Sequence, residues 1–249
     1  MDTFGEYSFS VRSYECGPGG AATLPSICNY LQEAASLNAE TLGFSKSDFV
    51  AAGENISWVL TRLRVQMMRY PRWGEQASVL TFPRGVRRIV AWRDFELRDA
   101  GGARLGVASS EWMLIDLASR RIAPVPDAVF ACANDVREPV LGETPFSKLR
   151  WDCRERAGAL AFRAKRGDID LNGHVNNVHY VEWLLETAPE RGECVDFEIT
   201  FRSETLVGEE VFAEGVEVEP SVFLHRVSAA DGRDHVIART VWNGANGAL

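Results

Sequence analysis

Apolar residues recur along the chain with two different spacings. Over residues 24–42 they keep the i, i+3, i+4, i+7 spacing of a helix with one buried face. Pro25 in the first turn and Gly43 just past the end are typical of helix boundaries, so this pattern predicts a helix over 24–42. A similar pattern predicts a second helix over residues 175–187.

Each predicted helix is preceded by one short strand-like run and followed by several more, all bounded by turn residues. The longer runs cover residues 57–67, 76–82, 88–99 and 104–116, and then 195–202, 210–219, 221–229 and 235–243. Asp-Ala-Gly-Gly at 99–102 and Asp-Gly at 231–232 predict hairpin turns. One long helix followed by consecutive antiparallel strands predicts an α+β unit in which a curved sheet wraps around a central helix.

The two halves of the chain resemble each other, which indicates a tandem duplication. Residues 9–35 align with 162–188, and residues 100–112, which end in Trp, align with 230–242, which end in the same way. We predict a first copy over 1–116, a linker over 117–158 and a second copy over 159–249. The two copies are expected to pair edge to edge into one pseudo-dimeric unit, burying both helices under a continuous sheet.

The second copy carries polar groups that the first copy lacks. Asp170, Asn172 and His174 stand just before the second helix. The aligned residues of the first copy are all small: Gly17, Gly19 and Ala21. Because both copies need a similar fold, structural need explains the polar set incompletely, although helix capping and turn formation stay open as an alternative.

A carboxylate shows the same asymmetry. Glu204 follows a predicted strand of the second copy, and the aligned residue of the first copy is Tyr70. We therefore expect Glu204 to work together with the polar residues at the start of the second helix. A surface glutamate with no chemical role is the alternative reading.

The same polar segment also resembles a calcium-binding loop, but incompletely. Residues 168–173 match the opening of an EF-hand, whereas its twelfth position is His179 in place of the bidentate Glu. The first copy has none of the ligands. His174 and His179 are five apart, so about 140° separates them on a helix, which disfavours a zinc site. No metal and no cofactor are expected.

Composition narrows the class of protein further. The 249 residues are 46% hydrophobic and 25% charged, and the net charge of -8 argues against nucleic-acid binding. No apolar run reaches the roughly 20 residues of a membrane span. The opening residues lack a signal-peptide pattern, and five scattered cysteines favour reduced thiols. We therefore expect a cytoplasmic protein.

Three stretches resemble the acyl-(acyl carrier protein) thioesterases in their shorter bacterial form. They are residues 29–44, residues 58–75 and the signature D-x-N-x-H-V-N-N-x-x-Y-x-x-W at 170–183. The resemblance implies a tandem hot-dog fold and hydrolysis of fatty acyl thioesters of acyl carrier protein, which ends fatty acid synthesis. It also implies that the family's catalytic positions are Asp170, Asn172, His174 and Glu204. Many plant members have a Cys after the matching Glu; here Thr205 stands there, so no cysteine nucleophile is expected.

The residues suggest a mechanism for this hydrolysis. Backbone N–H groups at the start of the second helix, at Val175, Asn176 and Asn177, are expected to stabilise the oxyanion. Either Glu204 or Asp170 would activate water or attack directly, which the sequence does not separate. His174 would protonate the leaving thiolate, and Asn172 would orient His174 or the carboxylate.

Partners and rivals follow from the same features. The first-half helix would line a channel for the acyl tail, with the chain length left open. Acyl carrier protein is acidic, so an arginine-rich patch is expected to receive it: Arg84, Arg87, Arg88 and Arg93. The alternatives are an acyl-CoA thioesterase, a hydratase of the same fold and a non-catalytic acyl-binding or regulatory protein. Oligomeric state is open, and a homodimer is one candidate.

Overall fold

The computed structural model describes residues 3–133, 138–153, 158–188 and 192–243. They form two compact units, Met1–Pro145 and Phe146–Leu249. Among the described helices, none is both long enough and apolar enough to cross a membrane. All five cysteines are free thiols.

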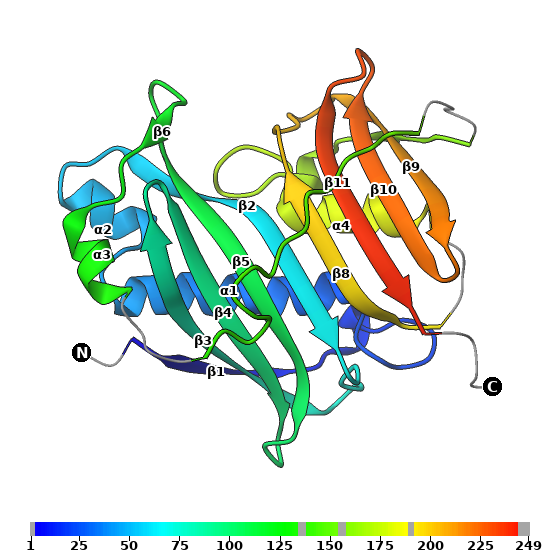
Figure 1. Ribbon diagram of the computed structural model, residues 1–249, viewed down its shortest axis with the longest axis horizontal. Coiled ribbons are helices and arrows are strands. Elements are labelled where there is room, and N and C mark those ends of the chain that lie inside the picture. The colour runs from blue at the N-terminus through cyan, green and yellow to red at the C-terminus, as the bar shows by residue number, and fades with distance from the viewer. Residues whose placement is uncertain (1–2, 134–137, 154–157, 189–191, 244–249) are drawn as a thin grey trace. The chain divides into compact units, whose positions relative to one another are not determined.

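The first unit wraps an antiparallel sheet around one long helix, α1, as Figure 1 shows. Its elements are β1 (Gly5–Ser10), η1 (Ser13–Glu15), α1 (Leu24–Thr41), α2 (Lys46–Ala51), β2 (Ile56–Met67), β3 (Gln76–Arg87), β4 (Val90–Asp99), β5 (Arg104–Asp116), β6 (Ile122–Ala123) and α3 (Asp127–Cys132). The strands pair antiparallel in the order β1-β3-β4-β5-β2, with the short β6 beside β5. Helix α1 packs against β1 and β3.

The predicted boundaries of the first helix are confirmed. Thr23 caps α1, because its side-chain oxygen accepts from the Ser26 N–H at 3.3 Å, and Pro25 lies in the first turn. Gly43 has φ +78, the left-handed conformation that ends a helix at little cost in a glycine. The apolar stripe of α1 is buried, including Ile27 and Leu31 at 0% and 1% exposure, so the helix supplies the core of this unit.

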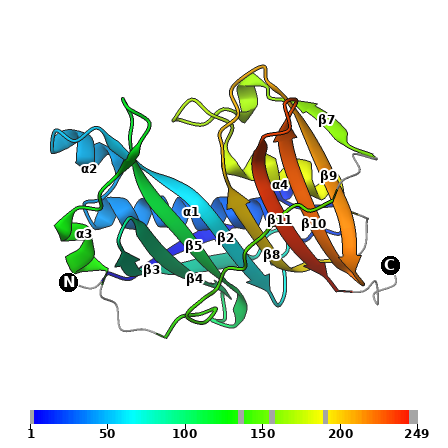
Figure 2. The same ribbon diagram turned by 45° about the horizontal axis from the view of Figure 1, so that its top comes forward.

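The second unit repeats the architecture of the first. Its elements are β7 (Leu160–Arg163), η2 (Arg166–Asp168), α4 (Asn177–Leu185), β8 (Cys194–Phe201), β9 (Glu210–Glu219), β10 (Val222–Ala229) and β11 (Asp234–Trp242). The antiparallel order β7-β9-β10-β11-β8 corresponds strand by strand to that of the first unit. Figure 2 shows the sheet of this unit passing over α4. The helix packs against β9 and β10.

Individual backbone hydrogen bonds confirm the duplication. In the first unit the Gly17 N–H donates to the Ala21 carbonyl at 2.9 Å. In the second unit the Asp170 N–H donates to the His174 carbonyl at 2.8 Å. Each of these turns contains a left-handed glycine and follows a short 3-10 turn that a carboxylate caps. The alignment of residues 9–35 with 162–188 therefore holds in three dimensions.

The core and the hairpins repeat as well. Phe9 stacks on Tyr30 with ring centroids 4.8 Å apart, and Phe162 stacks on Trp183 at 5.8 Å. The hairpin turns predicted at 99–102 and 231–232 are both formed. Each is closed by a hydrogen bond from the N–H of a glycine that has a positive φ. The fold class is thus an α+β unit occurring twice. The edge-to-edge pairing of the two copies stays a prediction.

The segment predicted as a linker, 117–158, contains more structure than expected. Strand β6 and helix α3 lie within it, and Val125 and Val129 are buried in a cluster with Phe49 and Leu114 of the first unit. The first unit therefore extends further along the chain than residue 116. The sequence of this segment gives no sign of the packing, because the residues that Val125 and Val129 contact lie far away along the chain.

Two buried carboxylates bind the rest of this segment, one in each unit. In the first unit the Val140 N–H donates to Asp94 at 3.1 Å. In the second unit the N–H and hydroxyl of Ser147 both donate to Glu198, at 2.7 and 2.8 Å. Asp94 is fully buried and Glu198 is 3% exposed, so these donors help to satisfy two buried carboxylates, together with the Ser109 hydroxyl, which donates to Asp94 at 2.6 Å.

One position in the core differs in chemistry between the copies. His225 on β10 pairs with Ala238, as Phe95 on β4 pairs with Ala108, so a histidine occupies the place of a phenylalanine. Its imidazole is fully buried between the hydroxyls of Thr187, at 2.9 Å, and Thr240, at 2.8 Å. Burial lowers the pKa of His225 to about 4.

This buried histidine predicts acid sensitivity. The unfolded chain binds a proton at His225 near pH 6.5, whereas the folded chain binds one only near pH 4. The contribution of His225 to the free energy of unfolding is therefore fully present above pH 6.5. It decreases by up to about 3 kcal/mol as the pH falls toward 4. Urea unfolding between pH 7 and pH 4 measures the slope. His225→Phe should flatten it, and an unchanged slope in that variant would contradict the assignment.

Candidate active site

A tight turn before α4 displays the polar residues of the second copy. The Oδ1 atom of Asp170 accepts from the N–H of Asn172 at 2.8 Å and of His174 at 3.4 Å. The Gly173 N–H closes the turn onto the Asp170 carbonyl at 3.0 Å. Gly173 has φ +85, which a residue with a Cβ would adopt only under strain. The carboxylate of Asp170 therefore shapes the loop that carries His174.

The structure brings His174 and Glu204 together. The distance from His174 Nε2 to Glu204 Oε2 is 3.0 Å, and the side chains are 19% and 40% exposed. Glu204 lies just past the end of β8. The residues that follow His174 and Glu204 are hydrogen-bonded to each other, because the Val175 N–H donates to the Thr205 carbonyl at 3.0 Å. The main chain thus brings an imidazole and a carboxylate into contact at a partly exposed place.

The same main-chain bond exists in the first unit without the chemistry. There the Ala22 N–H donates to the Pro71 carbonyl at 2.8 Å. Tyr70 precedes Pro71 as Glu204 precedes Thr205, and Ala21 precedes Ala22 as His174 precedes Val175. Tyr70 is buried. The predicted correspondence of Glu204 with Tyr70 is confirmed, and the acid–imidazole pair belongs to the second unit.

The expected oxyanion donors need correction at two of three positions. The N–H of Val175 is bonded to the Thr205 carbonyl, and that of Asn176 donates to the Asp168 carbonyl at 2.8 Å. Asn176 is the N-cap, and its Oδ1 accepts from the Val178 N–H at 3.0 Å. The helix begins two residues later than predicted, because the loop before it pairs with distant segments. Asn177, the first residue of α4, stays a prediction.

The arginine patch is also corrected, because two of its four members point into the fold. The Arg93 guanidinium donates to Asn38 Oδ1 at 2.6 Å and to the Thr81 hydroxyl at 3.1 Å. Burial lowers its pKa to about 10, so it stays charged at neutral pH. Arg84 lies 3.7 Å from the buried carboxylate of Asp94, with its side chain only 9% exposed. Neither side chain can receive a partner protein.

Arg87 and Arg88 remain from that patch. Both are exposed where the hairpin between β3 and β4 turns, and Arg88 has φ +61. Arg93 is held by Asn38 and Thr81, and Arg84 by Asp94 and the Gly142 carbonyl, whereas the turn leaves the other two side chains in solvent. The exposed basic group is therefore a pair, not a cluster of four.

The residues of the calcium-like motif are accounted for by the turn. The Oδ2 of Asp168 accepts from the Lys165 N–H at 2.8 Å, as part of a capping box. His179, at the position that an EF-hand reserves for Glu, lies 2.7 Å from Glu182 one turn along α4. The latter pair raises the pKa of His179.

The nearest cysteine has the properties of a core residue. Cys194 is 4% exposed, and burial raises the pKa of its thiol to about 12. A thiol of that pKa is almost entirely protonated near neutral pH and is a poor nucleophile. This agrees with the expectation that no cysteine attacks the substrate.

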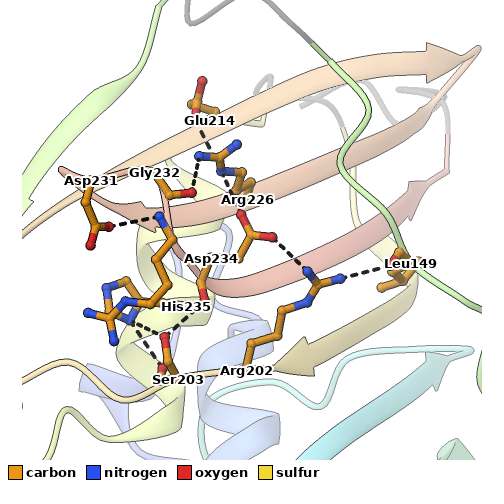
Figure 3. Close-up of polar contacts among 10 residues, drawn as sticks. Leu149, Arg202, Ser203, Glu214, Arg226, Asp231, Gly232, Asp234 and His235 are labelled. Carbon is orange, nitrogen blue, oxygen red and sulfur yellow. Dashed lines mark hydrogen bonds and ion pairs between the residues drawn. The ribbon is translucent and has the colours of Figure 1, made fainter.

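A polar network not singled out from the sequence includes Arg202 and Ser203, the two residues before Glu204 in the chain (Figure 3). Arg202 donates to Asp234 at 2.7 Å and to the Leu149 carbonyl at 3.2 Å. Next to it, the imidazole of His235 lies 3.0 Å from the hydroxyl of Ser203. The alignment of residues 100–112 with 230–242 already sets His235 against Leu105, and that change from apolar to polar was the available signal.

The fold and the site together define a class of protein. Two units, each with an antiparallel sheet wrapped around a helix, define a tandem hot-dog protein, and among the described residues the contact between an acid and an imidazole at Glu204 and His174 lies in the second unit. Family models for the N-terminal and C-terminal domains of acyl-ACP thioesterases match residues 3–133 and 153–244. The chain belongs to the acyl-ACP thioesterase family, where ACP is acyl carrier protein.

Individual relatives agree with this membership. A palmitoyl-ACP thioesterase of Cuphea hookeriana is 30% identical over 97% of this chain and 63% of its own. Oleoyl-ACP thioesterase 1 of Arabidopsis thaliana is 32% identical over 76% of this chain and 55% of its own. Both relatives are described as chloroplastic. The chain spans about three fifths of the length of these curated relatives.

Solved structures show the same fold. An acyl-ACP thioesterase from Bacteroides thetaiotaomicron VPI-5482 superposes with a TM-score of 0.85 at 25% identity, covering 97% of this chain and 98% of that one. The 12:0-ACP thioesterase from Umbellularia californica also gives 0.85 at 25% identity, covering 98% of each chain. The tandem hot-dog fold is therefore established for this chain.

The turn at Asp170 can be tested apart from catalysis. Asp170→Ala removes the acceptor of two backbone N–H groups and should lower the free energy of unfolding by about 1 kcal/mol, as loss of a helix cap does. Asp170→Asn keeps an acceptor oxygen and should stay within about 0.5 kcal/mol of the parent. Chemical denaturation of both variants measures this, and equal destabilisation would show that the charge, not the acceptor, holds the turn.

Proposed function

We propose that this protein hydrolyses fatty acyl thioesters of acyl carrier protein, releasing a free fatty acid and the carrier thiol. The contact of 3.0 Å between His174 and Glu204 carries the proposal, because it joins an acid and an imidazole only in the copy with the family signature. Membership of the acyl-ACP thioesterase family supports the substrate class. The five free thiols support a cytoplasmic location.

The geometry favours Glu204 over Asp170 as the group that activates water. One oxygen of Asp170 accepts two backbone hydrogen bonds in the turn, whereas Glu204 reaches the imidazole with its side chain. A water proton passes to the Glu204 carboxylate as the water oxygen bonds to the thioester carbon. That proton passes from Glu204 to His174 across their contact, the C–S bond breaks, and His174 gives the proton to the departing thiolate. The released fatty acid loses its own proton to solvent, and both side chains return to their starting states. Asn172 orients this pair from the same turn.

The two units take different roles in this proposal. The first copy has small or buried residues where the second has its acid and imidazole, and its helix α1 presents a buried apolar stripe. We assign the acyl tail to the first copy and the chemistry to the second. An acyl-CoA thioesterase would use the same residues, so the carrier has to be tested directly.

The assay is release of free fatty acid from acyl-ACP substrates of graded chain length. His174→Ala and Glu204→Gln should each lower kcat by at least about 100-fold, since each removes one member of the proton-transfer pair. His179→Ala is the matched control, because this histidine lies five residues further along, on helix α4, and pairs with Glu182. Its kcat should stay within about twofold of the parent. Full activity in His174→Ala would refute the mechanism.

A separate prediction concerns the recognition of acyl carrier protein by the exposed pair Arg87 and Arg88. Arg87→Glu combined with Arg88→Glu should raise KM for an acyl-ACP about tenfold, because the acidic carrier would meet reversed charge, and leave the KM for the same acyl-CoA within about twofold. Arg120→Glu with Arg121→Glu is the matched control, because these residues are also exposed and follow β5 at another turn of the first unit. Equal effects of both double variants would remove this docking site.

Assembly is tested in the same preparations. We infer that the chain can form a homodimer, and sedimentation equilibrium gives its mass directly. A mass of one chain at assay concentration would end this part of the proposal without touching the others.

A further inference from the structure

The main chain around Glu204 is held in the same way as its counterpart in the first unit. The carbonyl of His235, at the start of β11, accepts from the N–H of Arg202 at 2.8 Å and of Ser203 at 3.3 Å. In the first unit the carbonyl of Leu105 accepts two successive N–H groups, at 2.8 and 3.2 Å. This part of the fold therefore needs no particular side chain at position 235.

The side chain at this position nevertheless differs between the copies. Leu105 and His235 are both 1% exposed, so an imidazole has replaced an apolar group in the core. Burying an imidazole is less favourable than burying a leucine unless its nitrogens find partners. The fold already tolerates leucine here, so the histidine calls for a reason other than packing.

Its contacts lead to the residue next to Glu204. His235 Nδ1 lies 3.0 Å from the Ser203 hydroxyl and 3.3 Å from the Ser203 carbonyl oxygen. A carbonyl oxygen only accepts, so Nδ1 carries the hydrogen. The Ser203 hydroxyl in turn donates to the Asp234 carbonyl at 3.0 Å. Figure 3 shows Ser203 between these two residues of β11.

Glu204 is consequently held from both sides. His235 binds Ser203 before it, and the Val175 N–H binds the Thr205 carbonyl after it. The first unit has the second of these ties but not the imidazole. There Arg69, the counterpart of Ser203, extends to Glu75 on the exposed surface. The additional tie thus occurs only in the copy that carries the carboxylate.

We propose that His235 is a positioning residue, whose Nδ1–H fixes Ser203 and thereby sets the approach of Glu204 to His174. The inference rests on the proposed function. It assigns His235 no contact with substrate. Burial lowers the pKa of His235, in keeping with a neutral imidazole whose role is to donate a hydrogen bond.

Two matched substitutions replace a buried histidine of the second copy with the residue at the corresponding position of the first copy. His235→Leu should lower kcat about tenfold or more, because small misplacements of a catalytic group cost up to about 100-fold, with KM for acyl-ACP within about twofold. His225→Phe changes the other buried histidine, which binds Thr187 and Thr240, away from Glu204. It should leave kcat within about twofold.

Two conservative variants separate donation from packing. The amide nitrogen of Asn can occupy the place of Nδ1, so His235→Asn should recover kcat to within about threefold of the parent. The amide of Gln reaches the place of Nε2 instead, so His235→Gln should resemble His235→Leu. Equal activity of the Asn and Gln variants, or parental kcat in His235→Leu, would overturn the proposal.

A readout independent of turnover separates this inference from the proposed function. The ring resonances of His174, followed by NMR against pH, report its pairing with Glu204. They should shift in His235→Leu and stay unchanged in His225→Phe. If the parent protein releases no fatty acid, the proposed function fails while the NMR comparison still tests the positioning role. Unchanged His174 resonances in His235→Leu would refute it.

Discussion

The site depends on one backbone hydrogen bond, from the Val175 N–H to the Thr205 carbonyl. This bond joins the loop before a helix to the segment after a strand, two parts of the chain that are far apart in sequence. His174 and Glu204 are the neighbours of the two bonded residues, so the main chain sets their separation before either side chain contributes. The first copy forms the same bond with no reactive groups beside it, which shows that the constraint belongs to the fold.

Both copies therefore share one backbone arrangement, and the second copy carries the acid and the imidazole on it. In the second copy the turn contains a carboxylate, Asp170, that takes over two backbone donors, and a histidine follows within the same turn. A second histidine, His235, replaces an apolar core residue and reaches the strand end that bears the acid. The changes surround Glu204 and leave the strand order intact, which accounts for two copies so alike in backbone and so unlike in polarity.

Local sequence patterns were sufficient to predict the helices and strands, but not the residues that each side chain or backbone group contacts across the fold. Pro25 and Gly43 determine helix ends through neighbouring backbone geometry, so α1 was predictable within one residue. The start of α4 was not, because Val175 bonds to a residue thirty positions away. Arg84 was expected in solvent, but its counterion Asp94 lies on the next strand beyond a register shift. Alignment of the two copies found the acid–imidazole pair, since comparison supplies long-range information that periodicity lacks.

The buried carboxylates that bind the connecting segment determine how the chain can be divided. A fragment that stops at residue 133, where the N-terminal family model ends, would leave Asp94 without the Val140 donor. One that starts at 153 would remove both donors of Glu198. Each truncation removes hydrogen bonds from a buried carboxylate, and a lost partner of such a group costs about 1–3 kcal/mol. The loss is greater for Glu198, because Asp94 keeps the Ser109 hydroxyl and Arg84. Separate halves of the chain should therefore end beyond residue 140 and begin before residue 147.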